Sequence, residues 1–189
     1  MLENYIGFKS GEPIDLTRDG CSLADWLAGN SEEAEFALHP KGFPVFLRPE
    51  SIGMNDEYSE GDPYAVEETL DNAFHRRRIG VTLELVREAC EGNEAPKIVD
   101  IGCGKGFLTE HVRQSNNDAQ CSGLDHSVSA IAYAHDRFPR IDFAVGDAYT
   151  PPYQSASFDV VILNNIYEHV TDPVRLLAAA HRVLKPGGY

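Results

Sequence analysis

The sequence has little of what marks a membrane, secreted or metal-binding protein. No apolar run approaches the roughly 20 residues that span a bilayer, and residues 1–5 lack the basic and then apolar layout of a signal peptide. The 189 residues include only four cysteines, none of them in a C-x-x-C pair. This argues against a zinc site and against a disulfide framework. We therefore expect a cytoplasmic protein without a bound metal.

Positive charge is also scarce. The chain has 16 Lys and Arg against 30 Asp and Glu, for a net charge of −14, and residues 1–96 carry −12 of it. Phosphate contacts made by basic side chains supply most of the affinity for nucleic acid. The composition therefore predicts no nucleic-acid partner and no anionic membrane surface. The hydrophobic content of 42% is ordinary for a globular protein.

Residues 1–63 are predicted to form an N-terminal extension of short elements and loops. Gly, Pro, Asp and Asn recur every few residues, which favours turns. A short helix is expected over 22–27 with Ser22 as its cap. A short strand is expected over 43–47, at a sheet edge because Pro44 has no N–H to donate.

Residues 64–96 are predicted to be a helical lead-in. Apolar side chains recur at helical spacing between residues 66 and 89, and Gly80 is expected to split the segment into two helices. The basic cluster Arg76–Arg78 has two interpretations. It is a solvated helix face with local ion pairs, or one of its arginines meets a carboxylate in a nearby site.

From residue 97 onward, strands alternate with helices. Such alternation predicts an α/β fold with a parallel, Rossmann-like sheet and helices on both faces. Ligands of such sheets bind at the carboxyl ends of the strands. Asp172 and Pro173 have the types expected at the cap and first position of the last helix. The predicted strands are 97–100, 120–125, 141–145 and 158–163, and the predicted helices follow to about 114, from 127 to 137 and from 172 to 184.

A glycine turn follows the first of these strands. Gly102, Gly104 and Gly106 allow a sharp turn and the close approach of a ligand to the main chain, and the turn opens a helix whose N–H groups favour a negative group. A dinucleotide turn has Gly or Ala where this chain has Phe107, which argues against NAD or FAD, and the phosphate-loop pattern is absent. Cys103 within the turn is interpreted as a small packing side chain.

Asp125 ends the second strand, at about the 20-residue distance from the turn where a ribose-binding acid is expected. A carboxylate there can accept hydrogen bonds from both ribose hydroxyls. Taken alone, the same acid suits a helix cap equally well. Together with the glycine turn, it favours ribose binding.

Six segments then occur in order at suitable spacing. With them the chain resembles the class I S-adenosylmethionine-dependent methyltransferases of the small-molecule type. The resemblance covers residues 97–189, the predicted cofactor-binding core. The segments are 100–106, Asp125, Gly146-Asp147-Ala148, 158–161, Glu168-His169-Val170 and 184–188.

The resemblance implies S-adenosyl-L-methionine as cofactor and assigns residues to its parts. The methionine half would lie against Asp100 and the turn of Gly102, Cys103, Gly104 and Gly106. The ribose would bind Asp125, with Phe107 and His126 beside the sugar or base. The adenine would bind Asp147 and the Ala148 N–H, and the methionine ammonium would lie near Asn164.

The implied reaction is attack by an O, N or C atom of a small molecule on the sulfonium methyl. Positioning supplies most of the catalysis, and His169 is the candidate base, with Glu168 beside it. The other interpretation is that both residues order the loop after the fourth strand.

The chain stops at Tyr189, where the family's fifth strand should begin, and we expect a fragment that lacks the C-terminal strands. The alternative is that another chain or the N-terminal region covers the exposed strand. Two alternatives to an enzyme of this family stay open. One is a non-catalytic or truncated cofactor-binding module, and the other is a nicotinamide oxidoreductase. The sequence does not set the oligomeric state.

Overall fold

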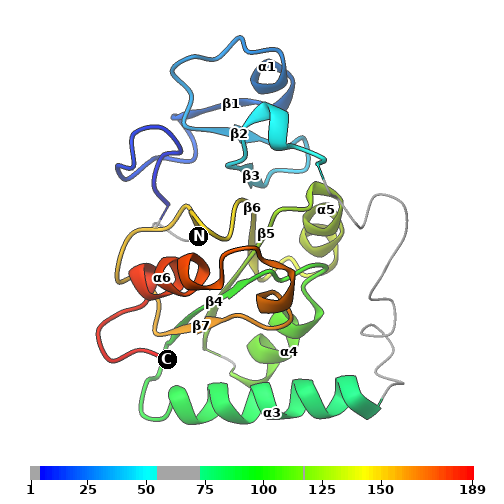
Figure 1. Ribbon diagram of the computed structural model, residues 1–189, viewed down its shortest axis with the longest axis vertical. Helices are drawn as coiled ribbons and strands as arrows, with labels where there is room; N and C mark the ends of the chain where they lie inside the picture. Colours follow the sequence, from blue (N-terminus) through cyan, green and yellow to red (C-terminus); the bar gives the residue numbers. More distant parts are fainter. Residues whose placement is uncertain (1–4, 55–72, 117) are drawn as a thin grey trace.

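The structure is a computed structural model that describes residues 5–54, 73–116 and 118–189. These residues form one seven-stranded sheet with helices on both faces (Figure 1). The sheet order is β1-β2-β3-β6-β5-β4-β7. Its strands are β1 Gly20–Ser22, β2 Phe36–Leu38, β3 Pro44–Val45, β4 Lys97–Ile101, β5 Gln120–Asp125, β6 Asp142–Val145 and β7 Val160–Ile162. The α-helices are α1 Leu23–Leu27, α3 Ala73–Ala89, α4 Phe107–Ser115, α5 Val128–Arg137 and α6 Pro173–Val183, and two 3-10 turns are η1 Pro49–Ser51 and η2 Tyr167–His169.

The C-terminal half is the predicted Rossmann-like sheet. Strands β6, β5, β4 and β7 all run parallel, and the α/β fold class is confirmed. Element ends shift by one or two residues from the predicted ones. The cap of α6 is confirmed too, because the side chain of Asp172 accepts a hydrogen bond from the backbone N–H of Arg175 and Pro173 opens the helix.

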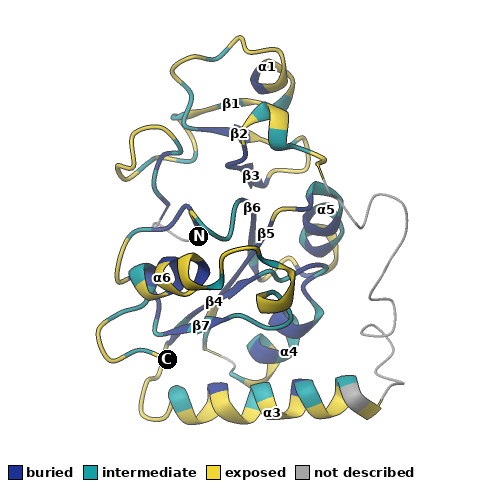
Figure 2. Cartoon of the chain, in the orientation of Figure 1, coloured by how far each residue is buried: buried dark blue, intermediate teal, exposed yellow. Residues whose placement is uncertain are grey.

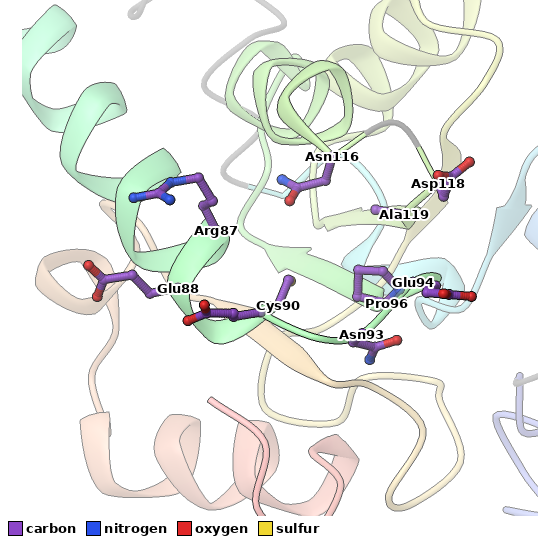
Figure 3. A pocket seen from close by; sticks show the side chains of 10 residues that line it. Arg87, Glu88, Cys90, Asn93, Glu94, Pro96, Asn116, Asp118 and Ala119 are labelled. Atoms are coloured by element: carbon purple, nitrogen blue, oxygen red, sulfur yellow. The ribbon is translucent and has the colours of Figure 1, made fainter.

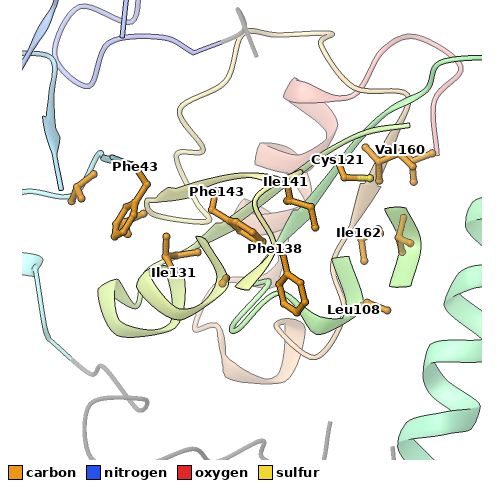
Figure 4. Close-up of a cluster of buried hydrophobic side chains, with 14 of the residues drawn as sticks. Phe43, Leu108, Cys121, Ile131, Phe138, Ile141, Phe143, Val160 and Ile162 are labelled. Atoms are coloured by element: carbon orange, nitrogen blue, oxygen red, sulfur yellow. The ribbon is translucent and has the colours of Figure 1, made fainter. Parts of the chain in front are cut away.

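The two faces of the sheet bury separate apolar clusters. Neighbouring residues of β4 point to opposite faces, so Ile98 belongs to one cluster and Val99 to the other. The Ile98 cluster packs beneath α3, α4 and α5, and Figure 4 shows part of it around β5 and β6. The Val99 cluster includes Val183 of α6. Figure 2 shows that strands β4, β5 and β6 are mostly buried between these layers.

The N-terminal strands extend the same sheet. β3 pairs antiparallel with β2 and parallel with β6, where Val45 lies opposite Val145 and the Phe46 N–H donates to the Val145 carbonyl at 2.8 Å. The predicted short strand is therefore confirmed, but its predicted edge position is wrong. Pro44 is tolerated inside the sheet because the pairing with β6 begins at Val45, one residue after the proline.

Aromatic rings join this extension to the core. The ring of Tyr5 stacks on those of Phe46 and Tyr153, with centroids 5.3 and 5.1 Å apart. On the other side of the sheet, the buried indole of Trp26 donates to the Leu47 carbonyl at 2.8 Å. The predicted short helix capped by Ser22 carries that indole, and its cap is confirmed. Extension and core therefore share buried contacts as well as a sheet.

Helix α3 runs without a break through Gly80. The prediction of two helices is wrong, because the exposed glycine keeps a helical backbone and a Cβ at this position would meet nothing. Glycine costs a helix about 1 kcal/mol relative to Ala but does not by itself end it. Buried Ile79 and Val86 hold both halves of α3 against the core. Predicted helical positions between 64 and 72 lie outside the described residues.

No helix in the described parts of the chain is long and apolar enough to cross a membrane.

Candidate functional site

The glycine turn lies between β4 and α4, as predicted. Gly102, Gly104 and Gly106 have φ values of 84°, 52° and 77°, in the left-handed region that favours glycine. The N–H groups of Gly102 and Cys103 both donate to the Leu124 carbonyl, at 2.7 and 3.1 Å. The turn is thereby fixed against the end of β5.

Two of these glycines are also required by close packing. A Cβ on Gly102 would lie 2.8 Å from Cδ1 of Ile166, and one on Gly106 would lie 2.7 Å from Cζ of Phe143. Ile166 reaches Gly102 from the loop after β7. Asn165 has a φ of 57°, a left-handed conformation that Asn tolerates better than most residues, and the chain turns there. The glycine turn therefore contacts the loop after β7.

Asp100 is buried just before the turn. Its carboxylate accepts a hydrogen bond from the Thr109 hydroxyl of α4 at 2.7 Å. Sequence reasoning missed Thr109. Its position between Leu108 and Val112, on the buried face of α4, is the signal that was available. The buried carboxylate is fixed by the helix that the turn opens.

Asp125 connects the glycine turn to the start of α5 and lies beside His126. One carboxylate oxygen accepts from the Gly104 N–H at 2.8 Å, and the other accepts from the Ser127 N–H at 2.9 Å. Nδ1 of His126 lies 3.4 Å from that second oxygen. The cap of α5 is the Ser127 hydroxyl, which accepts from the Ala130 N–H at 2.9 Å. Ser127, and not Asp125, is therefore the N-cap of α5. Asp125 instead holds the glycine turn through the Gly104 N–H.

The thiol of Cys103 points into the protein. A Cβ on Gly123 of β5 would lie 2.8 Å from the Cys103 Sγ, so this glycine leaves the space that the thiol fills. Burial, with the charges of Asp125 and Asp100 adding to it, raises the pKa of the Cys103 thiol well above its usual range. The interpretation as a small packing side chain is confirmed.

Asp147 and Ala148 follow the end of β6. They lie on the side of the sheet where the strands have their carboxyl ends, as does the glycine turn. The Gly146 N–H donates to the Asp125 carbonyl at 2.9 Å, which ties this loop to β5. One oxygen of Asp147 accepts from the Tyr149 N–H at 2.8 Å. Both Asp147 and Ala148 remain partly accessible.

Asn164 and His169 follow β7 but differ in their surroundings. The side chain of Asn164 donates from Nδ2 to the Thr82 hydroxyl of α3, at 3.3 Å. His169 and Glu168 lie in the turn η2 and are exposed. The Phe107 ring contacts Tyr133 and Phe138 of the α5 segment, with centroids 6.0 and 5.5 Å away. Its predicted contact with a sugar or base stays a prediction.

Tyr189 lies beside β7. The Tyr189 N–H donates to the Asp159 carbonyl at 3.0 Å, and its carbonyl accepts from the Val161 N–H at 2.8 Å. Two backbone hydrogen bonds therefore hold Tyr189 beside β7.

A pocket at the opposite edge of the sheet is a poor ligand site. It lies between the end of α3 and the loops that precede β4 and β5, near Pro96 and Ala119 (Figure 3). Ligands of parallel sheets bind at the carboxyl ends of strands, and this pocket lies at the amino ends. The described residues also hold no group of three or more His, Cys, Asp or Glu side chains that suits a metal ion.

Residues 99–189 match the family model described as a methyltransferase domain. Over these residues the chain is similar to the class I S-adenosylmethionine-dependent methyltransferases. Its relatives include a malonyl-[acyl-carrier protein] O-methyltransferase of Hahella chejuensis, 37% identical over 60% of this chain and 40% of that protein. A demethylmenaquinone methyltransferase of Chlorobaculum tepidum is 33% identical over 57% of this chain and 44% of that protein.

Solved structures agree on the fold of this part of the chain. A protein of Methanococcus maripaludis, provisionally assigned as an S-adenosyl-L-methionine-dependent methyltransferase, matches with a TM-score of 0.54 and 22% identity. The match covers 66% of this chain and 57% of that chain. The YcgJ protein of Bacillus subtilis gives the same TM-score over 60% of this chain and 48% of that chain, at 22% identity. The chain spans about half the length of the curated relatives that it matches.

The residues of the site fit the cofactor of this family. S-adenosyl-L-methionine offers hydrogen-bond donors at its ammonium, its ribose hydroxyls and its adenine amino group. Carboxylates stand at or just beyond the ends of β4, β5 and β6, in Asp100, Asp125 and Asp147. The three glycines of the turn between them carry no Cβ that could obstruct a ligand. The donor groups of the cofactor and the acceptors of the site are therefore complementary.

Proposed function

We propose that the protein transfers the methyl group of S-adenosyl-L-methionine to an O, N or C atom of a small molecule. The observation that carries the proposal is the meeting of the glycine turn with Asp125 through the Gly104 N–H, at one edge of a parallel sheet. A nucleotide-binding strand, turn and helix are thereby combined with a ribose acid. The relatives named above support the same chemistry.

We assign the cofactor contacts by their place along this edge. Asp100 and the turn of Gly102, Cys103, Gly104 and Gly106 bind the methionine half. The carboxylate of Asp125 retains acceptor capacity beyond its two backbone bonds and binds the ribose hydroxyls, with His126 beside them. Asp147 and the Ala148 N–H bind the adenine, and Asn164 binds the methionine ammonium.

The bound cofactor supplies a methyl group that is already activated by a sulfonium. The protein then needs to orient the acceptor and exclude competing water. We assign to His169, which is exposed on η2 beyond β7, the removal of a proton from an acceptor that carries one with a high pKa. The acceptor is a small molecule by the class of the relatives, and cytoplasmic location remains a prediction.

Calorimetry with S-adenosylhomocysteine and with NADH tests the cofactor assignment. We expect S-adenosylhomocysteine to bind and NADH not to bind. Binding of NADH without binding of S-adenosylhomocysteine would contradict the proposal and favour the oxidoreductase.

Transfer of labelled methyl from S-adenosyl-L-methionine to candidate acceptors tests the activity itself. It should be compared between this chain and a longer version that continues past Tyr189. If both bind the cofactor and neither transfers methyl to any acceptor tested, the binding-module alternative is favoured. A loss of turnover in His169→Ala with unchanged cofactor affinity would support His169 as the base.

A further inference from the structure

A hydrogen bond connects the middle of α3 to the end of β7. The Thr82 hydroxyl oxygen lies 3.3 Å from Nδ2 of Asn164 and 3.0 Å from the backbone carbonyl of Arg78. Thr82 and Asn164 are both half-buried and are 82 positions apart in sequence. The bond therefore joins the helix that precedes the methyltransferase domain to a residue of the proposed cofactor site.

The direction of this bond follows from the number of protons available. A hydroxyl has one proton to donate, and Thr82 donates it to the Arg78 carbonyl, four residues earlier in the helix. Toward Asn164, the Thr82 oxygen can only accept. The amide group that faces Thr82 must then be the Nδ2 donor, so the carbonyl Oδ1 of Asn164 points away from Thr82. Such networks are what determine the orientation of a side-chain amide.

The surroundings make this orientation matter. Thr82 and Asn164 line a cavity of about 540 Å³ whose other walls are mostly apolar. If the Asn164 amide turned over, its carbonyl would face the lone pairs of the Thr82 oxygen and the bond would be lost. A polar group that loses its partner in apolar surroundings costs more than an exposed one. Thr82 therefore holds the amide in one of its two orientations.

The place of Asn164 gives this orientation a function. Ile162, the last residue of β7, pairs with Asp100 of β4 in a parallel register. Asn164 and Gly102 each follow two residues later, so both come shortly after the carboxyl ends of neighbouring strands. We propose that Thr82 is a positioning residue, which presents Oδ1 of Asn164 to the ammonium of the cofactor. The inference rests on the proposed function, because it requires the methionine half to lie at the glycine turn.

Binding of two ligands separates positioning from a general structural role. S-adenosylhomocysteine carries the ammonium, whereas 5′-methylthioadenosine shares its adenosine and thioether and lacks the amino-acid group. Calorimetry should compare the unmodified chain with Thr82→Val, which keeps the shape and removes the hydroxyl, and with Thr82→Ser, which restores it. Val81→Ala changes an exposed neighbour on the same helix and serves as the control.

We expect Thr82→Val to weaken S-adenosylhomocysteine binding about fivefold to tenfold, the equivalent of one hydrogen bond. Its affinity for 5′-methylthioadenosine should stay unchanged, and Thr82→Ser and Val81→Ala should bind both ligands normally. Asn164→Ala should show the same selective loss, and adding Thr82→Val to it should cause no further loss.

Equal weakening of both ligands by Thr82→Val would overturn the inference, because it would indicate a structural role. Unchanged binding of both ligands, or additive losses in the double variant, would overturn it as well. In each of these cases the unmodified chain still binds S-adenosylhomocysteine and the proposed function stands. If the unmodified chain does not bind S-adenosylhomocysteine, the proposed function fails and the inference fails with it.

Discussion

The carboxylate of Asp125 accepts a hydrogen bond from the backbone N–H of Gly104 at 2.8 Å. This bond joins the end of β5 to the middle of the turn after β4. Asp125 is only 7% exposed, and its other oxygen accepts from the Ser127 N–H. Asp125, which is assigned to the ribose, therefore also stabilises the turn that is assigned to the methionine half.

Replacing Asp125 by Ala should weaken S-adenosylhomocysteine binding by about 1–3 kcal/mol, because the ribose acceptor and the hydrogen bond to the glycine turn are both lost. It should also lower the free energy of unfolding, since the Gly104 and Ser127 N–H groups lose their partner. Calorimetry and denaturant unfolding measure the two effects. Asp118→Ala, an exposed acid at the opposite edge of the sheet, should change neither, and unchanged affinity in Asp125→Ala would refute the ribose assignment.

Replacing Gly106 by Ala should destabilise the fold more than the same change at Gly92. Both glycines have positive φ, 77° and 78°, so each substitution costs about 1–2 kcal/mol of backbone strain. Only at Gly106 would the new methyl meet another side chain, Phe143 at 2.7 Å, while at Gly92 it meets nothing. Denaturant unfolding should therefore show a larger loss of unfolding free energy for Gly106→Ala than for Gly92→Ala. Equal losses would mean that the Phe143 ring moves aside at no cost.

Trp26 is the only tryptophan of the chain, and it is 4% exposed in the N-terminal extension. Because β3 continues the sheet onto β6, its fluorescence should report the same unfolding transition as far-UV circular dichroism. Two separated midpoints would show that the extension unfolds on its own.

Trp26→Phe should lower the free energy of unfolding by about 1–3 kcal/mol, because the buried Leu47 carbonyl loses its 2.8 Å donor.

The free energy of unfolding should fall in acid, because the Asp159 carboxylate becomes protonated. Burial alone raises the pKa of this carboxyl, but hydrogen bonds from the Lys185 ammonium and the Lys97 N–H outweigh burial and hold the pKa below its usual 3.8. The folded state then favours the ionised form. Its stabilisation is present above pH 3.8 and is lost as the pH falls through the lowered pKa.

Lys185→Met should reduce this acid dependence. Free energies of unfolding measured between about pH 5 and about pH 2.5 should fall less steeply in the variant than in the unmodified chain, because the folded-state pKa moves back toward the unfolded one. The same slope in both proteins would show that Lys185 does not set the pKa of Asp159.

Local patterns in the sequence predicted the elements that depend on nearby residues. The cap at Ser22, the start of α6 at Asp172 and Pro173, and the bounds of β5 all follow from short-range signals, and all are confirmed. The edge position of Pro44 and the split at Gly80 were predicted wrongly. Both depend on what packs against the segment, and a single residue's preference is small beside the free energy of burial.

The sequence by itself determined the α/β alternation, the glycine turn and the acids that follow successive strands, because strand and turn preferences and the order of motifs are properties of the local chain. Only the tertiary structure decided that β3 continues the sheet onto β6, that Asp125 binds the Gly104 N–H, and that the Asn164 amide donates to the Thr82 hydroxyl. Each of these contacts joins residues more than 20 positions apart. No local pattern fixes such a partner, because the register of packed strands and helices does so.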